Sequence, residues 1–590
     1  MVTLFGAFEV GSRALLAQQL GLNVTGHNIA NANTKGYSRQ RANFTTTHPF
    51  NVTPGSLGTG VTVDSIERMR DVFLDFQIRR QTTESGFFNK NDDILGELQL
   101  ILRDPLNPIA QLLEDNPAES GLNGLLSRFF NSFQELAANP ESIAIRATVR
   151  ETAIALTDGL NTLSRNLGDL QTRLNNEVEA TVGQINDILT RIASINEEIV
   201  AVEGAGQNSA NDLRDLRDQL LTDLAELVPV TVKEQANGSV DVSVMGTVAV
   251  VGARVSPFEV VVDPTDPAQQ FQILNIAERA RVLTDDVTSG ALGALIHGRD
   301  DSLSSFIGKI DEVATTVIRE VNRIHSESIG LSSFESLTSG ISGLDPTRTL
   351  DQLGLDFPPQ AGEFTIRVVD SDGSVQNLYT IIVDPSVDTL NSIAAQIDAI
   401  DGVAGPGGGE ISASVTASGE LQITGNGGLE FTFQGDTSNV VSALGFNNFF
   451  SGSDASDISI SAFILDEENG LRRIAASSTG AEGDNGGALA MAGVQNALVA
   501  GSGSTTLGDF YRSAVAELGG RAQRNTASGD ASRLTLADLV RKQESVAGVS
   551  LDEESVNLIR FQQAFSAAAR YITTVDSLID RVVNGLGITR

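Results

Sequence analysis

Both ends of the chain carry a narrow apolar stripe with the same spacing. Apolar residues recur at alternating steps of three and four over residues 558–586, and the pattern returns over residues 4–22. This is the spacing of a coiled coil. A helix with one such stripe is marginal alone, so the two ends are predicted to pair; the alternative is that each docks separately on a globular body. The stripes are Leu4, Phe8, Gly11, Leu15, Gln18 and Leu22, and Leu558, Phe561, Phe565, Ala568, Ile572, Val575, Ile579, Val582 and Leu586.

Charge separates the two ends from the rest of the chain. The formal net charge is −35, yet residues 1–47 carry four Lys or Arg against Glu9 alone. Residues 551–590 carry five acids and four Arg, so nearly all of the negative charge lies between the ends. The ends are therefore expected to share a nearly neutral, buried interface. The acidic balance argues against a nucleic-acid partner, which needs dense Lys and Arg.

The interior alternates between helical and strand-like patterns. Heptad-like apolar seams cover residues 163–202 and 303–324, whereas residues 228–285 and 362–460 switch to a period of two. Within the second block, three strands after residue 410 are expected to complete one small sheet, and a helix near 389–400 is expected to begin at a cap. Hairpin turns are predicted at Asn237-Gly238 and Asp372-Gly373, and the cap at Asp388 or Ser386.

These patterns predict a multidomain α+β protein. It would be an elongated coiled-coil or helical bundle with paired N- and C-terminal helices and inserted β-rich domains. The predicted domains are a terminal helical domain of residues 1–47 with 551–590, a bundle of 48–345 with 470–550 that includes the β-rich part 228–285, and an outer β-rich domain of 346–469.

No pattern in the sequence indicates catalysis. There are no cysteines, and the four histidines are not spaced as metal ligands. Phosphate-binding and nucleophile-elbow motifs are absent. Asp370, Asp372 and Gly373 are similar to the start of a calcium loop, but Ile381 occupies the position of its last acidic ligand, which favours a plain turn. We therefore expect no enzyme activity, no cofactor and no metal.

Segments that target proteins to membranes are also missing from the sequence. No apolar run approaches the ~20 residues of a membrane span. The first residues lack the basic start and continuous apolar run of a Sec signal peptide. We expect no membrane insertion, and a non-Sec export route stays open.

The segment after the first predicted helix carries a long motif. Residues 28–40 read NIANANTKGYSRQ, and residues 545–583 carry SLDEE followed by RFQQAF. Both closely resemble the terminal signatures of the bacterial flagellar rod, hook and hook-associated proteins. Residues 290–330, 437–461 and 480–495 also look like later segments of the hook-associated members. The resemblance is weakest over residues 345–436.

The resemblance implies a structural component of the flagellum. Such a protein joins the hook to the filament through coiled-coil packing of its terminal helices, after export through the flagellar type III apparatus, and is secreted to the hook-filament junction. Its implied partners are further copies of itself, the hook protein, the next hook-associated junction protein and an export chaperone acting on the C-terminal helix. Two alternatives remain: another axial protein, such as the hook protein or the third hook-associated protein, and a coiled-coil adhesin.

The candidate assembly residues combine the two apolar stripes with the motif. In the N-terminal part they are Leu4, Phe8, Leu15, Leu22, Asn28, Asn31, Asn33, Gly36 and Tyr37. In the C-terminal part they are Leu558, Phe561, Phe565, Ile572, Val575, Ile579 and Val582.

Overall fold

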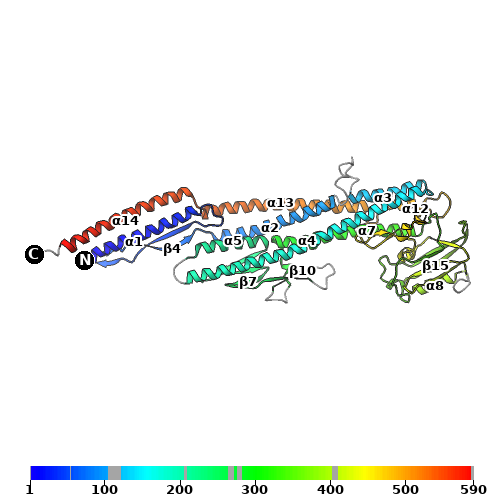
Figure 1. Cartoon of the computed structure of the whole chain (residues 1–590), viewed down its shortest axis with the longest axis horizontal. Helices are drawn as coiled ribbons and strands as arrows, with labels where there is room; N and C mark the ends of the chain where they lie inside the picture. Colours follow the sequence, from blue (N-terminus) through cyan, green and yellow to red (C-terminus); the bar gives the residue numbers. More distant parts are fainter. Residues whose placement is uncertain are drawn as a thin grey trace. The chain divides into compact units, whose positions relative to one another are not determined.

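The computed structural model describes most of the chain and divides it into two compact units (Figure 1). The described residues are 2–52, 55–103, 121–204, 209–262, 271–275, 282–400 and 409–585. Unit 1 comprises Met1–Ile94, Arg173–Asp301 and Ala522–Arg590, and unit 2 comprises Leu95–Thr172 and Ser302–Arg521. Each unit is therefore assembled from segments far apart in the sequence. The three-domain division stays a prediction.

Unit 1 contains the terminal helices, three two-stranded β-ribbons and a four-stranded sheet. Helices α2, α4 and α13 each contribute one part to this unit and the other part to unit 2. The helices are α1 (Val2–Ala30), α2 (Val72–Arg103), α4 (Ile143–Gly204), α5 (Asn211–Leu227), α6 (Gly290–His297), α13 (Leu507–Ala547) and α14 (Leu551–Gly585). The strands are β1 (Gln40–Thr46), β2 (Phe50–Val52), β3 (Gly55–Leu57), β4 (Val61–Arg68), β5 (Val230–Glu234), β6 (Val240–Val244), β7 (Thr247–Val251), β8 (Arg254–Val255), β9 (Phe258–Val262) and β10 (Phe271–Asn275).

The predicted seam of residues 163–202 lies on α4. Most of its members are buried, which confirms its helical period, while Ile188 is half-buried and Val202 is 41% exposed at the end of the helix. Two asparagines on α4 hold β-strands against it. Asn186 exchanges hydrogen bonds with the backbone of Phe258, and Asn196 does so with Val240.

The four-stranded sheet has the order β5-β6-β7-β8. Its first hairpin turns at Asn237 and Gly238, as the sequence predicts, and Gly238 takes a φ of 84°. The antiparallel pair β1–β4 was not predicted. Its strands carry many polar residues, so the alternation of apolar and polar side chains that marks a half-buried strand is weak there.

Unit 2 is built around α7 (Ser304–Ser326) and α3 (Gly121–Ala138). The predicted seam 303–324 lies on α7, where Phe306 is buried and the predicted member Ile307 is half-buried. Phe129 contacts the rings of Phe449 and Phe450, so the phenylalanines of α3 pack against a later segment. The short helices are α8 (Leu390–Asp398), α9 (Val440–Ala443), α10 (Ala462–Leu465), α11 (Gly470–Arg473) and α12 (Gly486–Gly493), and β17 (Phe450–Ser451) pairs with β18 (Ser459–Ile460).

The β-rich part of unit 2 has two three-stranded sheets, so the prediction of one small sheet is wrong. One has the order β13-β12-β16 and the other β11-β15-β14. Their apolar faces share one core with α8, which a single sheet of this size would leave half exposed. The strands are β11 (Ser336–Thr338), β12 (Gly362–Val369), β13 (Val375–Val383), β14 (Ile411–Val415), β15 (Leu421–Gly425) and β16 (Glu430–Gln434).

Two local predictions in this part have different outcomes. The turn at Asp372 and Gly373 is confirmed, because Asp370 Oδ1 accepts the backbone N–H groups of Asp372 and Ser374. The cap of α8 is not Asp388 or Ser386. Thr389 caps the helix, since its hydroxyl accepts the N–H of Ser392, and Asp388 instead accepts from the Ser392 hydroxyl.

None of the described helices combines enough residues with enough apolar character to cross a membrane. The same residues contain no set of three or more His, Asp or Glu side chains arranged to hold a metal ion.

A buried histidine anchors the end of α7. His325 is fully buried, its Nδ1 lies 2.7 Å from the carbonyl oxygen of Asn447, and its Nε2 accepts the N–H of Ala475 at 2.9 Å. Both ring nitrogens are therefore used by the neutral imidazole. Burial is the main cause that lowers the pKa of His325 from 6.5 to about 4, and the charge of Arg146 lowers it further.

This pKa predicts an acid-dependent loss of stability. Between pH 6.5 and about 4 the unfolded chain protonates His325 and the folded chain does not, so the free energy of unfolding falls as pH decreases. The expected loss is about 3 kcal/mol across this window. Urea titrations at several pH values, compared with His325→Gln, isolate this contribution, since other groups titrate in both chains. A difference between the two chains that stays constant with pH would contradict the prediction.

Candidate assembly interface

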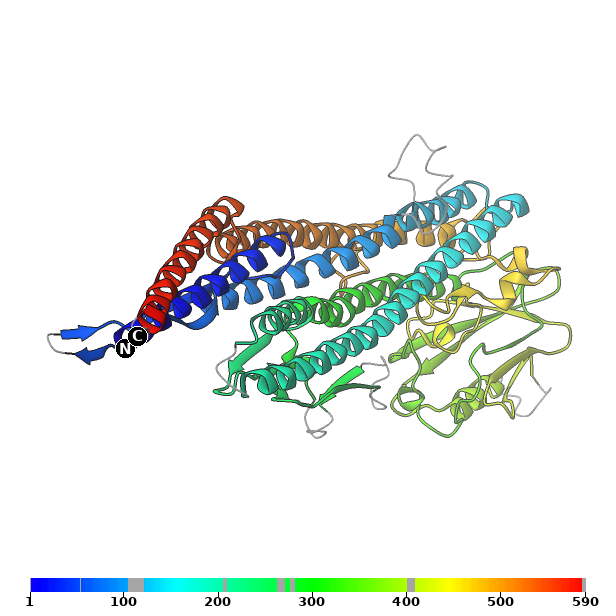
Figure 2. The same ribbon diagram turned by 60° about the vertical axis from the view of Figure 1, so that its left-hand side comes forward.

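The two terminal helices pack side by side in opposite directions (Figures 1 and 2). Gly11 lies against Ile572, and Gly21 lies against the ring of Phe561. Near the other end of α1, Asn28 reaches Glu554. These contacts fix an antiparallel register along the length of both helices, so the predicted pairing of the chain ends is present in unit 1.

Glycines on α1 let the helices approach closely. A methyl group on Gly11 would lie 2.7 Å from Ile572, and one on Gly21 would lie 2.9 Å from the Phe561 ring. Gly11 belongs to the predicted stripe without contributing a side chain, and this absence makes room for Ile572. The Phe561 ring also lies 5.8 Å from that of Phe44 on β1, so the ribbon covers part of the same contact.

The structure places the predicted apolar residues at different depths in the single chain. Val575 is buried, Val582 is 37% exposed and Phe8 is 39% exposed. Leu4 belongs to α1, but its side chain lies outside the described part of the chain. Ala17 and Val24, which were not predicted, are buried on α1. The half-buried members are Leu15, Leu22, Leu558, Phe561, Phe565, Ile572 and Ile579.

The motif, which begins on the last turn of α1, forms a set of polar contacts with the first turn of α14, here called the polar lock. The Glu554 side chain is 2% exposed and accepts hydrogen bonds from Asn28 Nδ2 at 3.1 Å and from Arg39 Nε at 3.0 Å. Arg39 also pairs with Glu553, and its backbone N–H donates to Ala547 O. Asn28 exchanges two further bonds with the Gln40 backbone. The lock therefore connects the start of α14 to both ends of the motif.

The remaining motif residues shape the turn. The Tyr37 hydroxyl donates to Asn28 Oδ1 at 2.7 Å, and burial together with Asp212, Asp215 and Glu554 raises its pKa, so the phenol stays protonated. Asn31 donates to the His27 carbonyl. Asn33 and Gly36, the remaining predicted residues of the motif, are exposed, and Gly36 has a φ of 84°. Only Gly36 needs the left-handed region that glycine adopts without strain.

An ionic cluster holds the motif to the rest of unit 1. Asp215 on α5 accepts both the N–H and the hydroxyl of Ser38, and Arg68 bridges Asp215 and Asp218 at 2.7 and 2.9 Å. Arg70 joins the same two carboxylates. Sequence reasoning missed this cluster. Its members are far apart in the chain, and acids are so frequent that no spacing singles them out.

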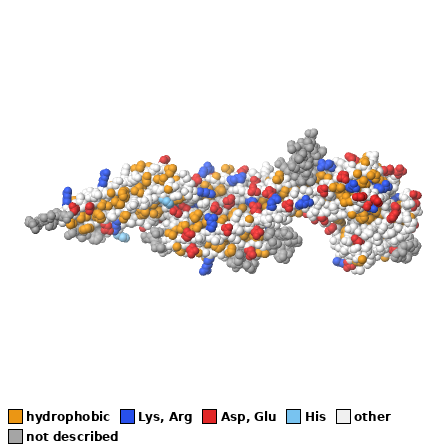
Figure 3. All heavy atoms as spheres, in the orientation of Figure 1, with side chains coloured by type: hydrophobic (Ala, Val, Ile, Leu, Met, Phe, Trp, Pro, Cys, Tyr) orange, Lys and Arg blue, Asp and Glu red, His pale blue; other side chains and the backbone are white. Residues whose placement is uncertain are grey.

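The paired helices leave a second set of apolar residues uncovered. Figure 3 shows hydrophobic side chains gathered over α1 and α14. Each of these side chains is more than one third exposed, whereas apolar side chains on a helix normally face a core. They were not predicted, because they lie off the main stripe. They are Phe5, Leu16, Val556, Ile559, Tyr571, Leu578 and Val583.

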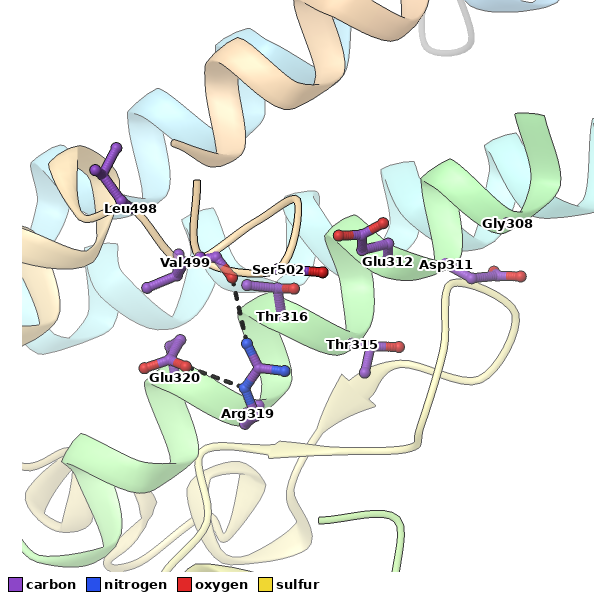
Figure 4. A pocket seen from close by; sticks show the side chains of 11 residues that line it. Gly308, Asp311, Glu312, Thr315, Thr316, Arg319, Glu320, Leu498, Val499 and Ser502 are labelled. Atoms are coloured by element: carbon purple, nitrogen blue, oxygen red, sulfur yellow. Dashed lines mark hydrogen bonds and ion pairs between the residues drawn. The ribbon is translucent and has the colours of Figure 1, made fainter. Parts of the chain in front are cut away.

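A groove of about 620 Å³ lies between α7 and residues 498–503 of unit 2 (Figure 4). Its polar side chains are used to hold neighbouring segments on α7. Arg319 donates to Glu320 and to Val499 O, while Glu312 accepts the N–H of Gly501. Asp311 accepts the N–H of Ala455. The groove therefore has a structural role.

Comparison with known families places both ends of the chain in one class. Residues 8–37 match the family described as flagella basal body rod protein, and residues 544–586 match the flagellar basal body rod FlgEFG protein C-terminal family. The two matches coincide with α1 and α14. The paired termini therefore define a protein of the flagellar axial class.

The rest of the chain identifies the branch of this class. Residues 106–336 match the flagellar hook-associated protein FlgK helical domain. Flagellar hook-associated protein 1 of Bacillus subtilis is 30% identical over 100% of this chain and 99% of its own length. The Escherichia coli protein of that name is 24% identical over 97% of this chain and 98% of its own length. The chain belongs to the flagellar hook-associated protein 1 family.

These findings confirm the family that the sequence motifs indicated and decide between the axial alternatives. One solved structure, of the flagellar hook junction protein FlgK from Burkholderia pseudomallei, has a TM-score of 0.52 at 16% identity. It covers 80% of this chain and 100% of that chain, which supports the multidomain α+β fold. The chain is thus a structural protein of the bacterial flagellum.

The close approach of the helices predicts opposite effects for two glycines of α1. Gly26 has open space around it. The substitution Gly26→Ala therefore adds helix propensity without a clash and should stabilise α1 by up to about 1 kcal/mol. Gly21→Ala forces the Phe561 ring to move and should destabilise the helix pair by about 1–3 kcal/mol. Amide hydrogen exchange of α1 and α14 measures both effects. Equal protection in the two variants would contradict the close packing.

Proposed function

We propose that this chain joins the flagellar hook to the filament through its terminal helices. The exposed apolar residues on α1 and α14 carry the proposal, because they lie outside the stripe through which the two helices contact each other and remain uncovered in the single chain. Neighbouring copies would cover them and form a continuous helical tube. Such a contact buries apolar area without a charge penalty, since the ends are nearly neutral.

The same helices would contact the partners at either side of the junction. The hook protein and the next hook-associated junction protein are proposed to present equivalent helix pairs to this surface. The acidic residues 346–469 would face away from the tube as an outer domain, where mutual repulsion favours solvent. We assign the chain a structural role with no catalytic step and no cofactor.

Export would precede assembly. We propose that the chain leaves the cell through the flagellar type III apparatus and acts outside it at the hook-filament junction. A chaperone that holds the C-terminal helix would shield Val556, Ile559 and Leu578 until export, because these exposed apolar side chains invite premature association.

A charge on the outward face tests the proposal. Leu578→Asp should abolish filament attachment, because Leu578 is 47% exposed in the single chain and would be buried between copies. The isolated variant should melt like the parent, since the substituted side chain faces solvent there. Electron microscopy of cells in which the variant replaces the parent gene counts hooks with and without filaments.

Leu489→Asp is the matched control. Leu489 is 53% exposed on α12 in unit 2, so the substitution adds the same charge away from the terminal helices. It should leave filament attachment intact. The amount of each variant in the medium separates failed export from failed joining. Normal filaments with Leu578→Asp at normal export would refute the proposed interface.

A further inference from the structure

One edge of the sheet β13-β12-β16 is open and the other is closed. Beyond β16, Phe334 exchanges two backbone hydrogen bonds with Phe431, at 3.0 and 2.9 Å. At the opposite edge, β13 has β12 as its one strand neighbour within the described part of the chain. An edge strand directs alternate N–H and C=O groups away from its sheet, where an added strand can pair with them.

Glu410 accepts hydrogen bonds from the side chains of Asn377 and Tyr379, but over residues 380–383 the edge lacks the features that normally prevent strand addition. Residues 375–383 read VQNLYTIIV, with no charged residue and no proline. Two of its outward side chains are apolar, with Leu378 56% exposed and Ile382 71% exposed, and they alternate with the polar Gln376 and Thr380. Val387, just beyond the strand, is 69% exposed. An apolar, β-prone edge of this kind favours pairing with an extended segment.

The face of the sheet is less open than its edge. Arg367 lies across the ladder from Leu378, yet it is only 7% exposed. A methyl group on Gly480 would lie 3.0 Å from its guanidinium carbon, so the segment at Gly480 covers this part of the face. A partner at β13 therefore has to be a narrow, extended segment beside the strand.

The negative charge of this domain indicates which kind of segment the β13 edge can bind. Residues 346–469 contain 18 Asp and Glu against two Arg. Glu363 lies opposite Ile382 in the ladder, Asp384 follows β13 directly, and Asp372 precedes it. Like charge opposes a second copy of this domain at the edge, whereas Lys or Arg side chains would find the carboxylates of Glu363 and Asp384 near the end of the strand.

We propose that β13 is a docking edge for an extended, cationic polypeptide segment of another protein. The segment adds as a strand beside residues 380–383, packs its apolar side chains on Leu378 and Ile382, and places basic side chains at Asp384 and Glu363. Backbone pairing supplies binding, and the charges and apolar side chains supply selectivity. This surface is separate from the terminal helices and gives the chain a binding activity besides joining.

The experiment uses the full chain and a defined probe. The probe is a fluorescein-labelled peptide of alternating valine and threonine with a lysine at each end and in the middle. Its anisotropy should rise saturably with added chain, and binding should weaken with salt. A second peptide with methylated valine amide nitrogens keeps the charge but loses backbone donors. It should bind roughly tenfold more weakly or worse.

Variants locate the site. Ile382→Lys should weaken binding by roughly tenfold or more without changing the melting temperature, because the side chain is exposed. Val248→Lys is the matched control, since Val248 is 49% exposed on β7, a strand with neighbours on both sides. Equal binding of the methylated peptide, or equal loss in both variants, would overturn the proposal. Self-association abolished by Ile382→Lys would also overturn it, in favour of a second copy as the occupant.

Discussion

The contact between Glu554 and the motif after α1 is the interaction on which the arrangement of the chain ends depends. A buried carboxylate is costly unless charged or polar donors surround it, and Asn28 and Arg39 supply them from more than 500 residues away. The lock aligns the first turn of α14 with the last turn of α1. From that point the antiparallel register carries Phe561 to Gly21 and Ile572 to Gly11. The motif therefore has two structural roles: it ends α1, and it binds the first turn of the C-terminal helix.

The chain separates two kinds of surface. Its ends are nearly neutral and present exposed apolar side chains on a helix pair, whereas residues 346–469 are strongly acidic. Apolar, neutral surfaces associate with one another, and like-charged surfaces stay apart. Under the proposed function, this division would let copies associate through α1 and α14 while their acidic parts stay solvated.

The sequence predicts helices and hairpins well where periodicity is strong. The 3/4 spacing over residues 558–582 and 163–199 predicts α14 and the buried stripe of α4, and Asn237-Gly238 predicts its hairpin. Close packing at Gly11 and Gly21 escapes the same reasoning, because a missing side chain contributes nothing to an apolar pattern. The cluster around Asp215 escapes it for a different reason. Its partners meet only in the folded chain, and the abundance of acids hides them.

Strand pairing is likewise hard to predict from the sequence where it depends on residues that are far apart in the chain. The turn at Asp372 is encoded by local residues and is predicted, but the assignment of β14, β15 and β16 to two sheets depends on contacts with Phe334 and β11 that are distant in sequence. The cap at Thr389 differs from the predicted Asp388 by one residue, since both side chains accept hydrogen bonds in the same turn.

A distance measurement within one chain tests the antiparallel pairing of α1 and α14 most directly. The chain has no cysteines, so spin labels at Glu9→Cys and Thr573→Cys report one distance by pulsed electron spin resonance in samples diluted with unlabelled chain. Labels at Glu9→Cys and Asp552→Cys provide the comparison. The pairing predicts a short, narrow distance for the first pair and a much longer one for the second, whose labels are offset by about 30 Å along the helix axis. Broad distributions of similar mean for both pairs would show that the two ends of the chain do not pair in this register.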